Sequence, residues 1–271
     1  MFYFIPTPIG NLGDISQRAL KTLEKCEVIF CEDSRVTKKL LALLSKEYEL
    51  EFGDKQFYSM HSHNEQELLK QIDKEIFKKE CCYLSDAGMP CISDPGIYLV
   101  NYLQKNSICY EVLSGSNAAL VGAVASGMIE KEFIFLGFLP NTGSKRDAAI
   151  LKLTTNNYPT IVYESPKRIL SLLSEIAKID KEREIFIIKE ATKKFETKFK
   201  ASAKELLEIV KELNLKGEWT VVVAPSSSAA PEHSITLKDI EELVIPPKQK
   251  AKLISKLTGE KIKDIYNKLS K

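Results

Sequence analysis

Short apolar runs alternate with segments of helical periodicity through the first part of the chain. The runs predict buried strands at Phe2–Ile5, Val28–Cys31, Phe57–Met60, Cys81–Leu84 and Cys109–Leu113. Between them, apolar residues recur at three- and four-residue spacing, as they do on one face of a helix. Because strands that are joined through helices run in the same direction, this pattern predicts a mostly parallel sheet covered on both faces.

Two of the predicted helices in this part begin with capping signals. Asn64 followed by Glu67 predicts a capping box, which opens a helix that runs to about Lys79. Either Asp14 or Ser16 is the expected N-cap of the first helix, because both side chains accept hydrogen bonds from free backbone N–H groups.

The middle of the chain is also mixed, but its strands are spaced differently. Strand candidates lie at Ile134–Phe138, Thr160–Tyr163, Glu184–Ile188, Phe195–Lys200 and Trp219–Ala224. Glu184–Ile188 and Phe195–Lys200 follow each other too closely for a helical crossover, which favours an antiparallel pair. We therefore expect two α/β domains of different topology, at residues 1–115 and 116–225.

The last part of the chain has a different character. The small residues Ser226–Pro231 have no potential to form a core and predict a linker over residues 226–236. Beyond them, Pro246, Pro247 and Gly259 separate three short helical patterns, at Leu237–Val244, Lys248–Leu257 and Glu260–Leu269. We expect a small helical appendage over residues 237–271.

Composition narrows the class of protein. The chain has 271 residues, of which 44% are hydrophobic, enough for two domains with cores. No apolar run reaches the roughly 18 residues of a membrane span, and the N-terminus lacks the features of a signal peptide. We expect a soluble cytoplasmic protein that does not contact a membrane. Its six cysteines lack CxxC spacing and are expected to be reduced core thiols rather than disulfides or metal ligands.

Positive charge is concentrated at the C-terminal end. The whole chain has a formal charge of only +2, but residues 246–271 contain eight lysines and two acidic residues. The rest of the molecule is therefore slightly acidic. A basic segment of this kind is typical of proteins that bind nucleic acid, although a solvated helical face gives the same count.

Candidate ligand sites lie in polar loops that follow predicted strands, where open α/β sheets bind their ligands. These loops span residues 6–14, 85–96 and 114–117, and no GxGxxG or GxxxxGK[ST] motif is present. Asp86 is expected to contact ligand hydroxyls or a cationic group. Asp94 either does the same or caps the next helix, with Pro95 in its first turn. Ser116 either belongs to a ligand-binding turn or is an ordinary N-cap.

Further polar groups follow other strands. Residues 32–35 and 61–65 lie after the second and third predicted strands and favour polar contacts or acid–base chemistry. A metal site at His61 and His63 is disfavoured, because the chain has only three histidines and lacks further ligands at suitable spacing. Residues 145–147 and 163–168 place basic groups beside loops, either as phosphate contacts or as solvated helix starts.

Nine motifs in register carry a family resemblance over essentially the whole chain. They are PTPIGNLGDI at 6–15, CEDSRVT at 31–37, HSHNEQ at 61–66, SDAGMPCISDPG at 85–96, SGSNAAL at 114–120, FLGFLP at 135–140, YESPKRI at 163–169, KEATK at 189–193 and KGEWTVVV at 216–223. With these motifs the chain resembles the tetrapyrrole-methylase superfamily, and within it the 16S ribosomal RNA (cytidine-2′-O)-methyltransferases.

This resemblance implies two α/β domains of the tetrapyrrole-methylase type, with S-adenosylmethionine in the cleft between them, and usually a homodimer. The implied partner is 16S rRNA in the small ribosomal subunit, methylated at a cytidine in the decoding region. The cofactor contacts implied for this sequence are Pro8, Ile9, Gly10, Asp86, Met89, Ser116, Asn117, Tyr163 and Thr220.

A ribose hydroxyl is a poor nucleophile, so we expect a nearby base or a group that stabilises its alkoxide. The candidates for this catalytic role are Asp33, Glu65, His63 and Glu164, and the chemistry requires no metal. The expected RNA contacts are Arg35, Lys145, Arg146, Lys167, Arg168, Lys248, Lys250 and Lys252. Two alternatives stay open: methylation of a tetrapyrrole or another small molecule, and a non-catalytic role in ribosome assembly.

Overall fold

The computed structural model describes residues 1–226 and 237–269. They form two compact units, Met1–Pro225 and Ser226–Lys271. Apart from Ser226, the predicted linker at 226–236 lies outside the described residues, as do the last two residues of the predicted appendage.

The first sheet of the larger unit is entirely parallel, which confirms the prediction for this part of the chain. Its strand order is β3-β2-β4-β1-β5. The strands are β1 (Phe2–Phe4), β2 (Val28–Cys31), β3 (Gln56–Ser59), β4 (Cys81–Leu84) and β5 (Tyr110–Val112). All residues of β2 and β4 are buried, as expected for central strands covered on both faces.

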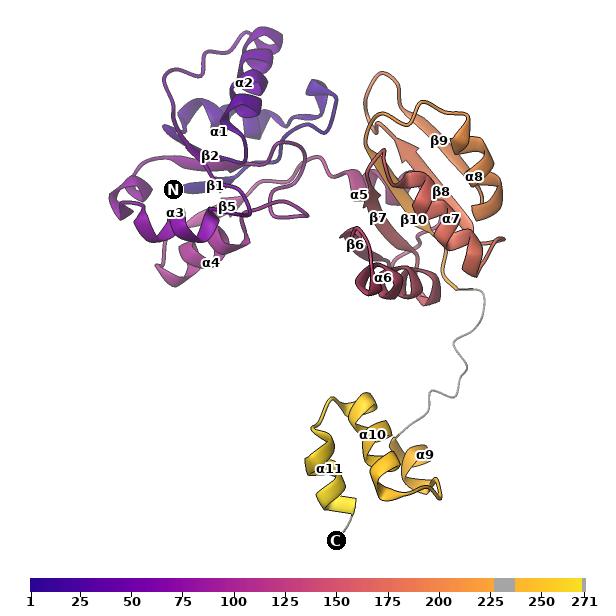
Figure 1. The fold of residues 1–271 in the computed structure, drawn as a ribbon. Helices are drawn as coiled ribbons and strands as arrows, with labels where there is room; N and C mark the ends of the chain where they lie inside the picture. The colour runs from indigo at the N-terminus through magenta and orange to yellow at the C-terminus, as the bar shows by residue number, and fades with distance from the viewer. Residues whose placement is uncertain (227–236, 270–271) are drawn as a thin grey trace. The chain divides into compact units, whose positions relative to one another are not determined.

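Alternate residues of these strands face two separate cores. Cys82 and Leu84 pack with α1 (Gln17–Lys25) and α2 (Ser34–Tyr48). Cys81 and Tyr83 pack on the other face with α3 (Glu65–Gln71), the 3-10 helix η2 (Lys74–Lys78) and α4 (Ile97–Lys105). A second 3-10 helix, η1 (Leu12–Asp14), precedes α1. Figure 1 shows α1 and α2 on one side of the strands and α3 and α4 on the other.

Ser16 caps α1, which settles the choice between the two predicted caps: its hydroxyl oxygen accepts a hydrogen bond from the Ala19 N–H at 3.0 Å. The single helix predicted from residue 64 to about Lys79 is wrong. The helix ends at Gln71, and the Asp73 carboxylate caps η2 instead. Asn64 forms no capping box, because its Oδ1 accepts a hydrogen bond from the His61 N–H at 2.8 Å.

The second sheet mixes parallel and antiparallel pairs in the order β6-β7-β10-β8-β9. Its strands are β6 (Ile134–Phe138), β7 (Thr160–Glu164), β8 (Glu184–Lys189), β9 (Thr197–Ser202) and β10 (Trp219–Val223). Strands β8 and β9 pair antiparallel, which confirms the prediction from their spacing. β9 begins two residues later than predicted, and Phe195 is largely exposed outside it.

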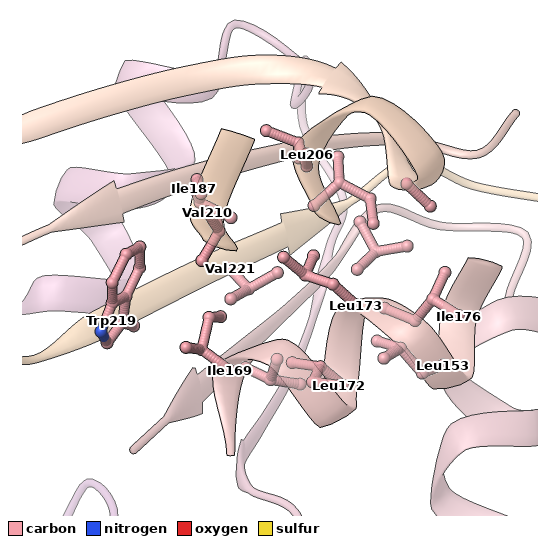
Figure 2. Close-up of a cluster of buried hydrophobic side chains, with 14 of the residues drawn as sticks. Leu153, Ile169, Leu172, Leu173, Ile176, Ile187, Leu206, Val210, Trp219 and Val221 are labelled. Atoms are coloured by element: carbon pink, nitrogen blue, oxygen red, sulfur yellow. The ribbon is translucent and has the colours of Figure 1, made fainter. Parts of the chain in front are cut away.

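Each face of the second sheet has its own layer. One face packs against α6 (Ser144–Thr155), α7 (Ile169–Ile179) and α8 (Ala203–Lys211), and their buried side chains surround Val221 (Figure 2). The other face packs against α5 (Ala118–Ser126). Ile9, from the loop after β1, joins this second cluster and so links the two sheets.

The C-terminal unit consists of α9 (Leu237–Glu242), α10 (Pro247–Thr258) and α11 (Ile262–Leu269), which confirms the three predicted helices. Ile240, Ala251, Ile254 and Ile265 form a small core of their own. Gly259 ends α10 with a left-handed φ of 76°.

Four of the six cysteines, Cys26, Cys31, Cys81 and Cys82, are buried free thiols. Cys91 is half-buried, and the expectation of a core thiol is wrong for Cys109, which is exposed. Among the helices that the structure describes, none combines the length and the apolar character needed to traverse a bilayer.

Candidate active site

Two loops at the carboxyl ends of β1 and β4 are tied together through their backbones. Thr7 and Gly88 exchange two N–H···O bonds of 3.0 Å. The Thr7 hydroxyl donates to the Ser85 carbonyl at 3.2 Å, and the Ser85 hydroxyl donates to the Gly88 carbonyl at 3.1 Å. Gly88 has a φ of +86°, and a Cβ there would lie 3.1 Å from Ile9 Cγ2. The two loops therefore form one rigid floor.

The start of α5 and the end of β7 meet beside this floor. Asn117, and not Ser116, caps α5, because its side chain accepts the Leu120 N–H at 3.1 Å. The Ala119 N–H donates to the Tyr163 hydroxyl at 3.0 Å. Burial is the main cause of the raised pKa of Tyr163, which keeps the hydroxyl neutral.

These elements line a cavity of about 400 Å³. Both sheets contribute to it. Its apolar surface comes from residues that include Ile9, Met89, Ile92, Phe138 and Trp219, and its polar surface from residues that include Glu32, Asp86, Asp94, Asn117 and Thr220. An apolar hollow with a few convergent polar groups is the usual form of a small-molecule site.

Five carboxylates line this cavity, and three of them have a raised pKa. Burial is the main cause for Glu32, Asp86 and Asp94. The charges of Glu32 and Asp86 add to the effect at Asp94 and raise its pKa to about 7. Like charges held together in a partly buried hollow favour a cationic ligand or ligand hydroxyls, because either relieves their repulsion.

The prediction that Asp94 caps α4 is wrong. The N-cap of α4 is Gly96, which makes no side-chain cap. The Glu65 carboxylate, which is almost fully buried, accepts the Leu99 N–H at 3.0 Å instead. Glu65 does not line the cavity, so we revise its predicted catalytic role to a structural one. His63 is exposed and lines a separate shallow surface hollow with Gln66 and Lys70.

Asp33 lies next to the cavity without lining it. Its carboxylate caps α2 through the Arg35 N–H at 2.8 Å and pairs with the exposed Arg35 guanidinium at 2.6 Å. Hydrogen bonds from Arg35 lower the pKa of Asp33 to about 2, which makes this carboxylate a poor base. The Asp33 N–H donates to Asp86 Oδ1 at 3.2 Å, so Asp33 orients a group that does line the cavity.

Glu164, at the end of β7, lies at the cavity wall but is held by two arginines. Its side chain is 0% exposed, with Arg168 Nε at 2.7 Å and Arg146 Nη1 at 3.6 Å. Arg146 also pairs with Glu175 at 2.7 Å and is buried. We therefore revise the predicted RNA contact of Arg146 to a positioning role, because its guanidinium is turned away from solvent.

The predicted cofactor residues lie close together in space. Ile9, Asp86, Met89, Asn117, Tyr163 and Thr220 all line the cavity, and Pro8, Gly10 and Ser116 are chain neighbours of these lining residues. Sequence reasoning missed the placement of Glu32 and Asp94 together at this cavity. Their positions after β2 and β4, two adjacent strands of a parallel sheet, are the signal that points to it.

The other predicted RNA contacts are mostly exposed. Lys145, Lys167, Lys248 and Lys252 are exposed, whereas Lys250 is half-buried and donates to the Glu241 carbonyl at 2.8 Å. Within residues 1–226 and 237–269, no group of three or more His, Cys, Asp or Glu side chains is arranged to hold a metal ion.

Residues 1–207 match the family model of Tetrapyrrole (Corrin/Porphyrin) Methylases. The ribosomal RNA small subunit methyltransferase I of Campylobacter fetus subsp. fetus (strain 82-40) is 60% identical over 270 residues, 99% of each chain. The protein of the same name from Helicobacter pylori (strain J99) is 38% identical over 279 residues, covering 98% of this chain and 96% of that one.

Solved structures of low sequence identity share the fold. A cobalt precorrin-4 methyltransferase superposes with a TM-score of 0.60 at 13% identity, covering 82% of this chain and 94% of that one. A uroporphyrin-III C-methyltransferase from Thermus thermophilus, complexed with S-adenosylhomocysteine, gives 0.55 at 13% identity, covering 82% and 96%. These two similarities confirm the predicted fold class.

Proposed function

The chain belongs to the tetrapyrrole methylase family and, within it, to the ribosomal RNA small subunit methyltransferases I, and from this premise we propose that it methylates the 2′-oxygen of a cytidine in the decoding region of 16S rRNA. The methyl donor is S-adenosylmethionine. The observation that carries the proposal is the 60% identity to a relative of that name over 99% of both chains.

The cavity fits this cofactor in size and in chemistry. Its volume of about 400 Å³ lies within the usual range of roughly 300–1,000 Å³ for small-molecule sites. Ile9, Met89 and Phe138 offer apolar surface to an adenosine. Asp86 and its neighbouring carboxylates suit ribose hydroxyls and a positively charged sulfonium.

S-adenosylmethionine supplies an electrophilic methyl group when it is bound. The protein then has to align the methyl group with the acceptor oxygen. Holding two reactants in the correct orientation can lower the activation barrier by about 7–11 kcal/mol. The backbone clamp between Thr7 and Gly88 and the hydrogen bond from Ala119 to Tyr163 fix the cavity wall for this purpose.

Exposed lysine and arginine side chains support the proposal that the methyl acceptor is RNA. Lys145 and Lys167 follow β6 and β7, and Arg35 follows β2. The C-terminal unit adds Lys248 and Lys252, with Lys250 close by on the same helix. We propose that these groups contact the phosphate backbone, which makes RNA affinity dependent on salt. Arg168, held by Glu164, is 20% exposed and is proposed as a phosphate contact beside the cavity.

The proposal extends to organisation and location. We propose that residues 1–115 and 116–225 act as two α/β domains that share the cofactor, and that residues 237–271 form an RNA-binding appendage. The family resemblance favours a homodimer, which light scattering of the purified protein would show as twice the 30.6 kDa chain mass. We also propose a cytoplasmic location, because the proposed acceptor is ribosomal.

Transfer of a labelled methyl group tests the acceptor class. Purified protein and labelled cofactor are incubated with small ribosomal subunits, with free 16S rRNA and with a tetrapyrrole. We expect label in the small subunit. Label in the tetrapyrrole alone would contradict the proposal, and cofactor binding without transfer to any acceptor would favour a non-catalytic assembly role.

A further inference from the structure

Asp94 is a cavity carboxylate without a protein partner. It forms no hydrogen bond or ion pair with the residues that the structure describes, whereas Asp86 accepts the Asp33 N–H. A half-buried carboxylate that faces a ligand cavity with free lone pairs is available to accept a proton from whatever occupies that cavity.

The other carboxylates that line the cavity have partners: Glu32 accepts a hydrogen bond from the Asp86 backbone, Asp86 accepts the Asp33 N–H, and Glu218 pairs with Lys193 at 3.0 Å. The four bases predicted from the sequence are unsuited by their contacts or positions. Asp33 is paired with Arg35, and Glu164 is buried against Arg168 and Arg146. Glu65 and His63 do not line the cavity. A base must lie within hydrogen-bond reach of the proton that it removes. Asp94 lines the cavity and has no competing partner among the described residues, so it is the strongest candidate for the base.

The loop that presents Asp94 is held in an unusual conformation. Cys91 and Ser93 both adopt left-handed backbone angles, with φ of 66° and 69°, which L-residues rarely adopt. The loop also packs closely against the second sheet, because a Cβ at Gly137 would lie 2.7 Å from Ser93 Oγ. A Cβ at Gly96 would likewise lie 2.6 Å from Cys91 Sγ, so close packing on both sides of Asp94 holds the backbone that presents it.

The groups around Asp94 come from several elements. Glu32 follows β2, Asp86 follows β4, Tyr83 lies in β4 and Tyr163 in β7. The Tyr83 hydroxyl is fully buried without a hydrogen-bond partner among the described residues, and Asp94 contributes to its raised pKa. With burial and two neighbouring carboxylates, the pKa of Asp94 rises to about 7, which suits a base that works near neutral pH.

We propose that Asp94 is the general base that removes the proton from the ribose 2′-hydroxyl. This inference rests on the proposed function. As the bond between the 2′-oxygen and the methyl carbon forms, the carbon–sulfur bond breaks and its electron pair stays on sulfur. The hydroxyl proton passes to an Asp94 carboxylate oxygen and then to solvent, so the products are the methyl ether, a neutral thioether and one proton.

Single-turnover methylation of small subunits between pH 6 and 9 tests this role. The wild-type rate should rise with pH and level off, because only the ionised carboxylate is a base. Asp94→Asn should lower the rate by about 100- to 10,000-fold and flatten the pH profile, and Asp94→Glu should restore part of the rate. Asp54→Asn, in an exposed loop without described contacts, is the matched control and should behave as wild type.

Calorimetry gives a readout that is independent of turnover. Binding of the cationic S-adenosylmethionine near Asp94 should lower the pKa of this carboxylate, so wild-type protein should release a fraction of a proton at pH 7. The neutral S-adenosylhomocysteine should release less. In Asp94→Asn the proton release should be largely lost, while affinity for S-adenosylhomocysteine stays within a few-fold, which also shows that the variant is folded.

The outcomes separate the two proposals. If wild-type protein transfers no methyl group to small subunits, the proposed function fails. If wild type is active and Asp94→Asn keeps its rate and pH profile, the general-base role of Asp94 is overturned. Loss of S-adenosylhomocysteine binding in a folded Asp94→Asn variant would also overturn it, since Asp94 would then be a binding residue.

Discussion

Buried charge serves two different purposes in this molecule. The Glu164 carboxylate is fully enclosed and neutralised by Arg146 and Arg168. Glu32, Asp86 and Asp94 are partly enclosed and line the same cavity. In the first arrangement, removal of any one partner leaves a buried charge uncompensated and destabilises the fold. The second arrangement lowers stability but creates a binding site.

Replacing Glu164 should therefore be costly to the fold. In Glu164→Gln, the buried Arg146 and the half-buried Arg168 lose their shared counter-charge, and we expect the free energy of unfolding to fall by about 3 kcal/mol. Glu208→Gln is the matched control, because Glu208 pairs with Lys211 at the surface and should cost less than about 1 kcal/mol. Urea denaturation of the three proteins measures both values, and equal losses would contradict the structural role of Glu164.

Asp94 should destabilise the protein as pH rises. Its pKa is raised from 3.8 to about 7, so between these values the folded state binds more protons than the unfolded chain. Stability contributed in this way falls as pH increases through that window. Asp94→Asn should gain stability relative to wild type from pH 4 to 7, with a constant difference above pH 7. Parallel stability curves for the two proteins would refute the raised pKa.

At the scale of elements, the clamp between the β1 and β4 loops is the feature on which the cavity depends. Gly88→Ala forces a side chain into a left-handed backbone and into contact with Ile9, and should cost about 1–2 kcal/mol and weaken S-adenosylhomocysteine binding several-fold. Gly53 has a φ of +62° with open space around it. Gly53→Ala should show a similar loss of stability with unchanged binding, as calorimetry and denaturation would reveal.

Strands were more predictable than the ends of helices, for a physical reason. Val28–Cys31 and Cys81–Leu84 are continuous apolar runs in central strands, and the structure confirms both ranges. The helix predicted to reach Lys79 failed because Asp73 starts a new 3-10 turn, a local competition that periodicity does not register. Such side-chain to backbone bonds decide where elements end.

The site was only partly predictable for a similar reason. Asp86 and Tyr163 follow from motifs, and the structure brings them to one cavity. The enclosure of Arg146 and Glu164 depends on tertiary packing between α6, α7 and β7, which sequence spacing does not encode. Asp94 looked like a helix cap because it precedes Pro95 and Gly96, but Glu65 provides the side chain that meets α4.

At the scale of the whole molecule, charge is divided between the two units. The acidic cavity belongs to the larger unit, and the lysine-rich helices α10 and α11 belong to the smaller one. We therefore expect the cationic cofactor and the polyanionic substrate to bind surfaces of opposite sign. This division predicts that RNA affinity and cofactor affinity respond to separate substitutions.

Removing lysines from α10 should weaken RNA binding selectively. The double variant Lys248→Gln, Lys252→Gln should bind small-subunit RNA more weakly, with a salt slope reduced by about one unit for each lost phosphate contact. Cofactor affinity should not change. Lys39→Gln, Lys46→Gln on α2 removes the same charge as a control. If both double variants weaken RNA binding equally, RNA affinity depends on net charge alone and not on the lysines of α10.

The identity of the methylated nucleoside tests the account most directly. Small subunits that lack the modification are incubated with the protein and isotope-labelled S-adenosylmethionine, and the 16S rRNA is digested to nucleosides for mass spectrometry. The account predicts label in 2′-O-methylcytidine from the decoding region. Label on a nucleobase, on another nucleoside, or absent from the RNA would contradict it.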